Sequence, residues 1–330
     1  MKRFGHKFAL SLAATLCLGL GLQGAAQAQD QAKGKRIAYL TSSTSNPFIA
    51  KLATTVQEEA TARGMTVNLL TTPYDAALQS QQVSDVIAQG YDALLITPVA
   101  ERGIIPALTA AKNAKLPVFV VNSPVADGNE QLYTSFIGED NAELGRVAGE
   151  AIAEALKDRK NPKIALVTGL LAEGVAPRRL EGFKAAIAKH PGIKIVATED
   201  AKWDTGTAER ISGQLFARFA AQGGLDGVYG MADNVAHGVI LAAKAAGVPL
   251  GTGQGQTVVV SSNCMKFGVD HIRQGEQYST ATQLPVRTGK ETVAAVADYF
   301  AGKPVPKNNH LEISVITKAN LDKFVDACSY

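Results

Sequence analysis

The sequence predicts an α/β fold made of two doubly wound parallel-sheet domains. Short apolar runs alternate along the chain with longer segments whose apolar residues recur at helical spacing. The short runs are nearly continuous in Val, Ile, Leu and Ala, which is typical of strands covered on both faces. A chain of 330 residues holds enough of these runs for two sheets, each about the size of one doubly wound domain.

The expected strands fall into two series. The first comprises Arg36–Leu40, Thr66–Leu70, Ala93–Ile96, Val118–Val121 and Thr134–Ile137. The second comprises Ile164–Val167, Ile193–Ala197, Gly227–Tyr229 and Val258–Val260. After Gln283 the chain is expected to form another helix and then a late strand at Leu311–Ile316. These late segments are expected to return to the first domain and cross back again, which would form a hinge.

The first 28 residues have the pattern of a secretory signal peptide. A basic start, MKRFGHK, precedes an apolar run and the small-residue pattern Ala-Gln-Ala at positions 26–28. The apolar run is too short to span a membrane. Removing residues 1–28 takes away three of the 33 Lys and Arg and none of the 30 Asp and Glu, so the remaining chain is formally neutral. We therefore expect an exported protein with residues 1–28 cleaved.

Several function classes lack support in the sequence. A neutral chain with one Trp and few aromatic residues has no electrostatic footprint for nucleic acid. The histidines form no pair at metal-ligand spacing, and the glycine-rich GTGQGQ precedes a strand where a dinucleotide fingerprint would follow one. We expect no cofactor and no metal. Cys264 and Cys328 could form a disulfide in an oxidising compartment or remain two buried free thiols, and the sequence supports both equally.

The turns that follow the predicted strands are rich in neutral polar residues. In open α/β sheets ligands bind beyond the carboxyl ends of the strands. The first such turn, TSSTSNPF at Thr41–Phe48, carries more hydroxyl and amide groups than a connection between a strand and a helix requires. These turns therefore predict a polar, largely neutral ligand site.

Five segments together resemble a known family. They are SNPF after the first strand, VIAQGYDALLITP at Val86–Pro98, IGEDNAELGRVAGE at Ile137–Glu150, RLEGF at Arg179–Phe183 and ATQLPVRTG at Ala281–Gly289. In this order, behind a signal peptide, they resemble a periplasmic solute-binding protein of the ribose-binding, lactose-repressor-like type I family of ABC importers.

The resemblance implies two lobes joined by a three-segment hinge. The N-terminal lobe would comprise residues 29–138 and 284–311, and the C-terminal lobe residues 139–283 and 312–330. Such proteins close over a small ligand in the periplasm and deliver it to an ABC permease in the inner membrane. They catalyse no reaction, and we expect a monomer because the hinge must move freely.

The resemblance also assigns ligand-binding roles to the first polar turn. Asn46 and Phe48 match the ligand-contacting loop of the family. Asn46 would offer a donor and an acceptor, and Phe48 an apolar face for a carbon skeleton. As alternatives, Asn46 could cap the following helix with Pro47 at its first position, and Phe48 could belong to the core.

Three residues of the second lobe match ligand positions of the family. Arg179 stands where the family places an arginine that binds hydroxyls, Trp203 where an aromatic ring stacks on the ligand, and Gln283 agrees with the family pattern. Arg179 could instead be a surface residue beside Arg178, and Trp203 a core anchor. From a cleft position we expect Arg179→Ala to weaken ligand binding and to alter folding little.

The chain departs from the ribose-binding pattern at other positions. Asn122 and Ser123 replace an Asp-Arg pair, Asn263 replaces an Asp, and Ala232 replaces an Asn with Asp233 beside it. We take Asn122, Ser123, Asp233 and Asn263 as further ligand-binding candidates. The site thus loses two carboxylates and one arginine, which argues against ribose itself. Amide and hydroxyl groups can both donate and accept, so they suit hydroxyls that rotate.

We therefore expect a binding component of an ABC importer that captures a small neutral sugar or polyol. A sugar acid or a signalling molecule, presented to a chemoreceptor or sensor, is the alternative ligand and role. A secreted α/β enzyme is a further alternative, which rests on the architecture alone.

Overall fold

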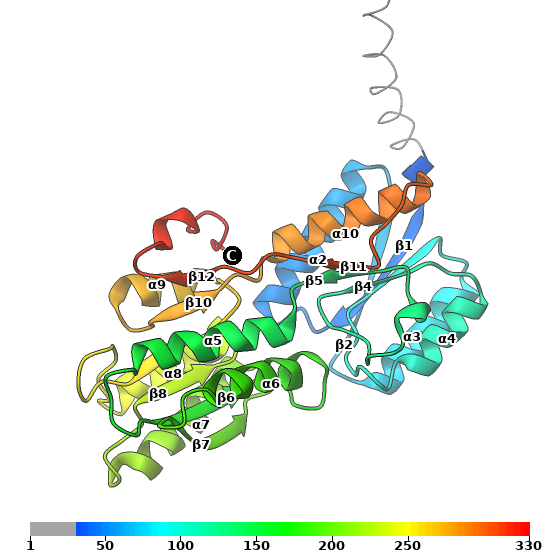
Figure 1. The fold of residues 1–330 in the computed structure, drawn as a ribbon. Helices are drawn as coiled ribbons and strands as arrows, with labels where there is room; N and C mark the ends of the chain where they lie inside the picture. The colour runs from blue at the N-terminus through cyan, green and yellow to red at the C-terminus, as the bar shows by residue number, and fades with distance from the viewer. Residues whose placement is uncertain (1–30) are drawn as a thin grey trace, which may run out of the picture.

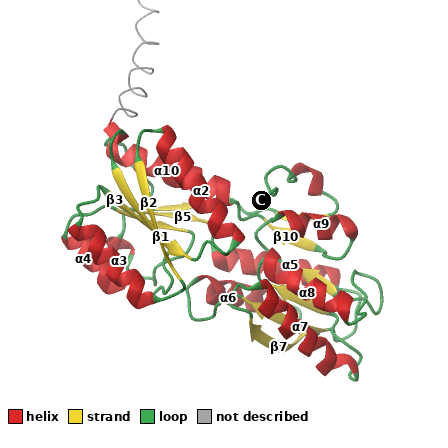
Figure 2. Ribbon diagram, turned by 180° about the vertical axis from the view of Figure 1, so that it is seen from behind, coloured by secondary structure: helices red, strands yellow, loops and turns green. Residues whose placement is uncertain are grey.

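The computed structural model describes residues 31–330, so the predicted signal peptide at 1–28 lies outside the described residues. Two α/β lobes lie side by side, each built on one sheet with helices on both faces (Figures 1 and 2). The two predicted doubly wound sheets are confirmed, since each has six strands and parallel pairing dominates.

The first sheet has the order β11-β5-β4-β3-β1-β2, and all its pairs are parallel. Its strands are β1 (Arg36–Ser42), β2 (Thr66–Thr72), β3 (Ala93–Ile96), β4 (Val118–Val121), β5 (Ser135–Gly138) and β11 (Asn308–His310). Helices α2 (Pro47–Ala62) and α10 (Pro285–Phe300) cover one face, while α3 (Ala76–Ala88) and α4 (Ile105–Asn113) cover the other. A short 3₁₀ helix, η1 (Glu130–Leu132), precedes β5.

Alternate residues of the interior strand β1 pack into the apolar cores on the two faces of the sheet. Ile37 and Tyr39 pack with α2 and α10, whereas Ala38 and Leu40 pack with α3 and α4. All four side chains are almost fully buried. A strand buried on both faces has no polar alternation, and this explains the continuous apolar runs in the sequence.

The second sheet has the order β12-β10-β9-β8-β6-β7, with only the β10–β12 pair antiparallel. Its strands are β6 (Lys163–Thr168), β7 (Lys194–Asp200), β8 (Gly227–Gly230), β9 (Val258–Val260), β10 (Ser279–Ala281) and β12 (Val315–Thr317). Helices α5 (Asn141–Ala155) and α6 (Val175–Ile187) cover one face, and α7 (Thr205–Ala220) and α8 (Asp233–Ala245) cover the other. Helix α9 (Lys266–Gln274) and the 3₁₀ helix η2 (Leu321–Lys323) lie at the β12 edge.

The chain passes between the two sheets three times, at residues 139–140, 282–284 and 311–314. The predicted late strand at Leu311–Ile316 is wrong in its bounds, because most of it forms the third crossing. Only Val315 and Ile316 enter a strand, β12, and a separate strand, β11, precedes the crossing. β11 is a three-residue edge strand with largely exposed side chains, so no apolar run marks it in the sequence.

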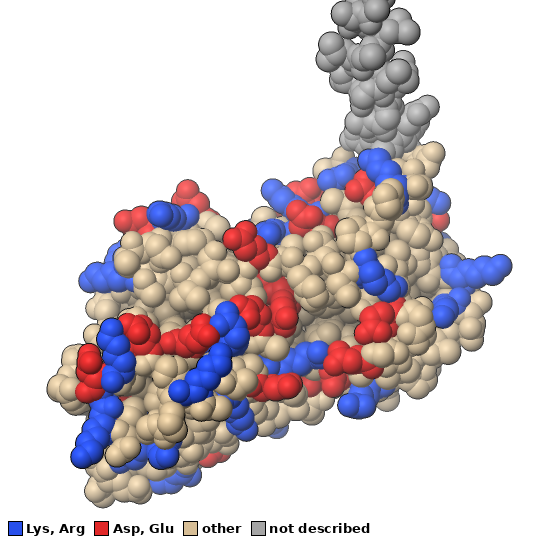
Figure 3. All heavy atoms as spheres, viewed as in Figure 1, with Lys and Arg blue, Asp and Glu red and all other residues tan. Residues whose placement is uncertain are grey.

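Acidic and basic side chains are interspersed over the face shown in Figure 3, without a large area of one sign. Within residues 31–330, no helix is both long enough and apolar enough to cross a membrane. Cys264 and Cys328 form a disulfide with their Cα atoms 5.0 Å apart. Of the two alternatives open from the sequence, the structure therefore adopts the disulfide.

Candidate functional site

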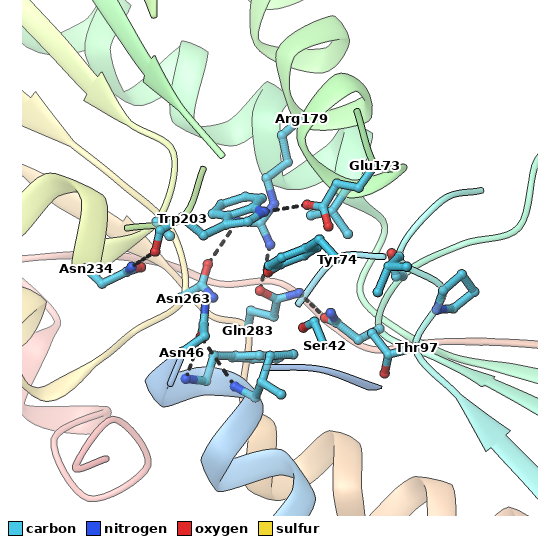
Figure 4. Close-up of a pocket in the computed structure, with 18 residues that line it drawn as sticks. Ser42, Asn46, Tyr74, Thr97, Glu173, Arg179, Trp203, Asn234, Asn263 and Gln283 are labelled. Atoms are coloured by element: carbon cyan, nitrogen blue, oxygen red, sulfur yellow. Dashed lines mark hydrogen bonds between the residues drawn. The ribbon is translucent and has the colours of Figure 1, made fainter. Parts of the chain in front are cut away.

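A cavity of about 40 Å³ lies between the lobes, at the carboxyl ends of strands from both sheets. The first lobe contributes Ser42, Asn46, Phe48, Ile49, Tyr74, Thr97, Pro98, Val99, Asn122 and Ser123. The other side of the cavity is formed by Glu173, Val175, Arg179, Trp203, Ala232, Asn234, Asn263 and Gln283. Figure 4 shows these side chains converging from separate strand ends, which is the ligand position expected of open parallel sheets.

Asn46 and Phe48 combine the alternative roles that the sequence left open. The Asn46 side-chain oxygen accepts hydrogen bonds from the backbone N–H groups of Phe48, at 2.9 Å, and Ile49, at 3.4 Å, and so caps α2. Phe48 is 3% exposed and belongs to the core cluster under α2, yet both residues also line the cavity. The cap fixes the start of the helix and thereby the position of the Phe48 ring at the site.

Arg179 is buried in the site and its guanidinium is held by neutral groups. Nε donates to Asn141 Oδ1 at 3.0 Å, and Nη1 donates to the Met231 carbonyl at 3.0 Å and to Asn263 Oδ1 at 2.9 Å. Nη2 donates to Gln283 Oε1 at 2.6 Å. A guanidinium has five N–H donors, so one N–H on Nη2 remains beyond these four bonds. Arg179 is 1% exposed, and the surface alternative is therefore wrong.

Four other predicted residues, Asn122, Ser123, Asn263 and Gln283, line the same cavity as this arginine. Gln283 donates from Nε2 to Asn122 Oδ1 at 2.8 Å, so one amide network connects the two lobes. Ser123, next to Asn122, lines the cavity, and its hydroxyl is buried without a partner among the described residues. The structure thus places Asn122, Ser123, Asn263 and Gln283 in one site with Arg179.

Trp203 lies in the cavity wall with its ring near Arg179. The guanidinium carbon is 5.5 Å from the ring centroid, and indole Nε1 donates to Glu173 Oε1 at 2.5 Å. Asn234 Nδ2 donates to the Trp203 carbonyl at 2.6 Å. The ring also packs against the apolar clusters on both faces of the second sheet. Trp203 is therefore at once a core contact and a lining residue.

Asp233 is a correction to the expected site, because it does not line the cavity. Its buried carboxylate accepts hydrogen bonds from the Ser261 hydroxyl, from Met265 N at 2.6 Å and from Gln277 Nε2 at 3.1 Å. Burial raises the pKa of this carboxyl to about 6. Asp233 begins α8 and points into the second lobe, so the next residue, Asn234, lines the cavity instead.

Ten of the 18 cavity residues were not among the expected ligand contacts, and Glu173 and Tyr74 are the two of these with ionisable side chains. Both lie in turns that directly follow strands, β6 for Glu173 and β2 for Tyr74. Burial is the main cause that raises the pKa of Glu173 to about 8, and the Trp203 hydrogen bond opposes it. The Tyr74 pKa is raised by burial and, second, by the charge of Glu173. Their position after strands was the signal that could have identified them.

Four residues of the cavity wall have positive φ although none is a glycine. They are Tyr74 at 59°, Asn122 at 64°, Trp203 at 62° and Asn263 at 98°. Left-handed backbone is uncommon for residues with a Cβ and typically costs on the order of 1–3 kcal/mol each. Such strain concentrates where surrounding contacts hold side chains in functional positions. In residues 31–330 no cluster of His, Cys, Asp or Glu is arranged to hold a metal.

The model of the periplasmic binding protein domain family matches residues 37–304. The chain belongs to this family. It is 27% identical over 308 residues to the ribose import binding protein RbsB of Haemophilus influenzae, covering 93% of this chain and 98% of that protein. It is 25% identical over 325 residues to a xylitol-binding protein of Mycolicibacterium smegmatis, covering 96% of this chain and 87% of that protein.

A solved structure agrees with the fold and with this family. The periplasmic binding protein component of the arabinose ABC transporter from Shewanella sp. ANA-3, bound to arabinofuranose, superposes with a TM-score of 0.80. Sequence identity is 25%, and the match covers 88% of this chain and 95% of that chain. The resemblance to type I periplasmic binding proteins is thereby confirmed, and the chain is a binding protein and not an enzyme.

Proposed function

We propose that this family member is the periplasmic component of an ABC importer and captures a small neutral sugar or polyol between its lobes. The observation that supports a neutral ligand is the hydrogen bonding of Arg179. Four of its five N–H donors are bound to neutral oxygens, so its fork is not free to hold a carboxylate bidentately. A single remaining N–H suits one hydroxyl oxygen.

The other polar groups of the cavity also favour hydroxyls. Ser123 Oγ and Asn234 Oδ1 are buried without partners among residues 31–330, and buried polar atoms in native structures normally have one. Glu173 adds a buried carboxyl that keeps its proton near neutral pH and in that form can donate to a ligand hydroxyl. A polyol can donate to these oxygens and accept from Arg179, with Phe48 and Trp203 offering apolar faces to its carbons.

The relatives support an import role, since they include an import binding protein and an ABC transporter component. We propose that the lobes comprise residues 29–138 with 284–311 and residues 139–283 with 312–330. The divisions at 283/284 and 311/312 fall inside stretches that pass between the sheets, and the division at 138/139 falls where β5 ends. Movement of these crossings would let the protein, as a monomer, close over ligand and present the closed form to an inner-membrane permease.

Calorimetry with D-ribose, D-allose, L-arabinose, xylitol and myo-inositol, beside D-gluconate and D-galacturonate, tests the ligand class. We expect at least one neutral compound to bind with micromolar or tighter affinity and both sugar acids to bind far more weakly. A sugar acid as the tightest ligand would overturn the assignment. Sedimentation of the same samples checks the monomer.

A further inference from the structure

The last residues of the described chain return to the junction of the two lobes. After β12 and η2 the chain runs back over α9, and in both views its end lies between the lobes (Figures 1 and 2). Two contacts hold this segment. Cys328 is bonded to Cys264, and the Tyr330 carbonyl accepts a hydrogen bond from Lys266 N at 3.1 Å.

Tyr330 reaches from this anchor to the backbone of the ligand site. Its hydroxyl donates to the Asn263 carbonyl at 2.5 Å and lies 3.2 Å from the Gln283 carbonyl. Its ring packs against the apolar cluster of the first lobe, which also contains Phe48. Burial raises the pKa of the Tyr330 hydroxyl well above its ordinary value, so the hydroxyl remains a donor.

Asn263 and Gln283 are the two cavity residues whose side chains orient Arg179. Their amide oxygens accept from Nη1 at 2.9 Å and from Nη2 at 2.6 Å. Asn263 and the adjacent Cys264 have φ of 98° and 56°, a conformation that needs restraint from neighbouring structure. The disulfide restrains Cys264, and the Tyr330 hydroxyl binds the carbonyl of Asn263.

We infer that Tyr330, anchored by the Cys264–Cys328 disulfide, is a positioning residue of the ligand site that sets the orientation of Arg179 through Asn263 and Gln283. The inference rests on the proposed function for its effect on ligand affinity. Its effect on the ligand-free site can be measured separately, because Trp203 is the only tryptophan of the chain and lies beside Arg179.

The primary variant is Tyr330→Phe, which keeps the ring and removes only the hydroxyl. Tyr299→Phe, at a tyrosine that is 39% exposed and lies outside the cavity, is the matched control. Losing a hydrogen bond that orients a binding group should weaken affinity about three- to tenfold. We expect this loss for the tightest-binding compound of the neutral panel, together with a shifted Trp203 emission and a changed acrylamide quenching in ligand-free protein.

The disulfide is tested by reduction of the native protein and by the double variant Cys264→Ser with Cys328→Ser. Both should reproduce the emission change of Tyr330→Phe. Reduction of the Tyr330→Phe protein should change its emission little further, because the disulfide acts on the site by anchoring Tyr330. A Tyr330→Phe protein with native emission, native quenching and affinity within twofold would overturn the inference, even if its melting temperature were lower. If no panel compound binds native protein, the proposed function fails, and the emission measurements still decide the role of Tyr330.

Discussion

Arg178 and Asp127 join the two lobes through an ion pair with Nη2 and Oδ1 2.8 Å apart. The same guanidinium nitrogen lies 3.3 Å from Glu101 Oε2, also in the first lobe. Arg178 lies in α6, one residue before Arg179. The two adjacent arginines therefore have separate roles. Arg179 organises the cavity, whereas Arg178 links the lobes outside it.

Replacing Arg178 with Ala should favour the open form modestly. Asp127 is 84% exposed, and exposed ion pairs contribute about 0–1 kcal/mol, so we expect about a two- to fivefold loss of ligand affinity at low salt. The loss should shrink as ionic strength rises because salt screens such pairs. Calorimetry at two salt concentrations measures it. Arg218→Ala, which removes an exposed pair with Glu199 inside the second lobe, is the control and should not change affinity.

Replacing Arg179 with Ala should abolish measurable binding and also destabilise the protein. The change leaves the side-chain oxygens of Asn141, Asn263 and Gln283 without their donor in a buried site. Removing one partner of a buried charged network costs about 2–5 kcal/mol. This prediction differs from the expectation, drawn from the sequence alone, that folding would change little.

Urea unfolding of Arg179→Ala, compared with Arg210→Ala at an exposed position of α7, measures the destabilisation. Equal midpoints for the two variants would show that the network around Arg179 contributes nothing to folding.

Much of the fold could be predicted because buried parallel strands appear in the sequence as continuous apolar runs. Runs such as Ala93–Ile96 and Val118–Val121 match β3 and β4 residue for residue. The polar edge strand β11 has no such apolar run. It pairs with β5, which lies far away in the chain. The spacing of apolar residues indicates which positions of a helix or strand are buried. A strand with exposed polar side chains has no such spacing and cannot be recognised in this way.

The site could be predicted where one turn follows one strand, as for Asn46 and Asn263. Asp233 shows where this reasoning fails. Whether Asp233 or Asn234 faces the cavity depends on the residue at which α8 begins, and one residue turns a helix by about 100°. Tyr330 contacts residues 67 and 47 positions away through a segment with no periodic pattern. Only the folded chain brings it to the site.

Glu173 should make stability and Trp203 emission depend on pH. Burial raises its pKa from an ordinary 4.5 to about 8, so the folded protein keeps a proton that the unfolded chain loses. Its contribution to stability is therefore fully present below pH 4.5 and falls as pH rises toward about 8, by an amount on the order of a few kcal/mol.

The Glu173→Gln variant should have a flatter stability profile between pH 5 and about 8 than native protein. A residual slope should remain, because burial also raises the pKa of Glu139 to about 7 and that of Asp233 to about 6. Since Trp203 donates to Glu173, its emission should titrate near pH 8 in native ligand-free protein and not in the variant. Identical titrations of the two proteins would exclude Glu173 as the titrating group.

Gly169 lies where the Trp203 ring leaves no room for a side chain. A substitution at Gly169 therefore tests whether ligand binding depends on the position of this ring. A Cβ at Gly169 would lie 2.0 Å from Trp203 Cε2 and 2.1 Å from Cζ2, far inside contact distance. The ring would have to move, because Gly169 directly follows β6, an interior strand whose backbone is paired on both sides. Gly169→Ala should therefore disturb the Trp203–Glu173 hydrogen bond and the contact with Arg179, and weaken neutral-sugar binding about tenfold.

Gly213→Ala in α7 is the matched control, since a Cβ there meets no atom within 4 Å. Alanine has a higher helix propensity than glycine, so this control should bind ligand normally and be slightly more stable. Affinity, Trp203 emission and the unfolding midpoint are to be measured for both variants. Gly169→Ala with native emission and affinity would mean that the ring can shift without cost, and Trp203 would then not form a fixed wall of the site.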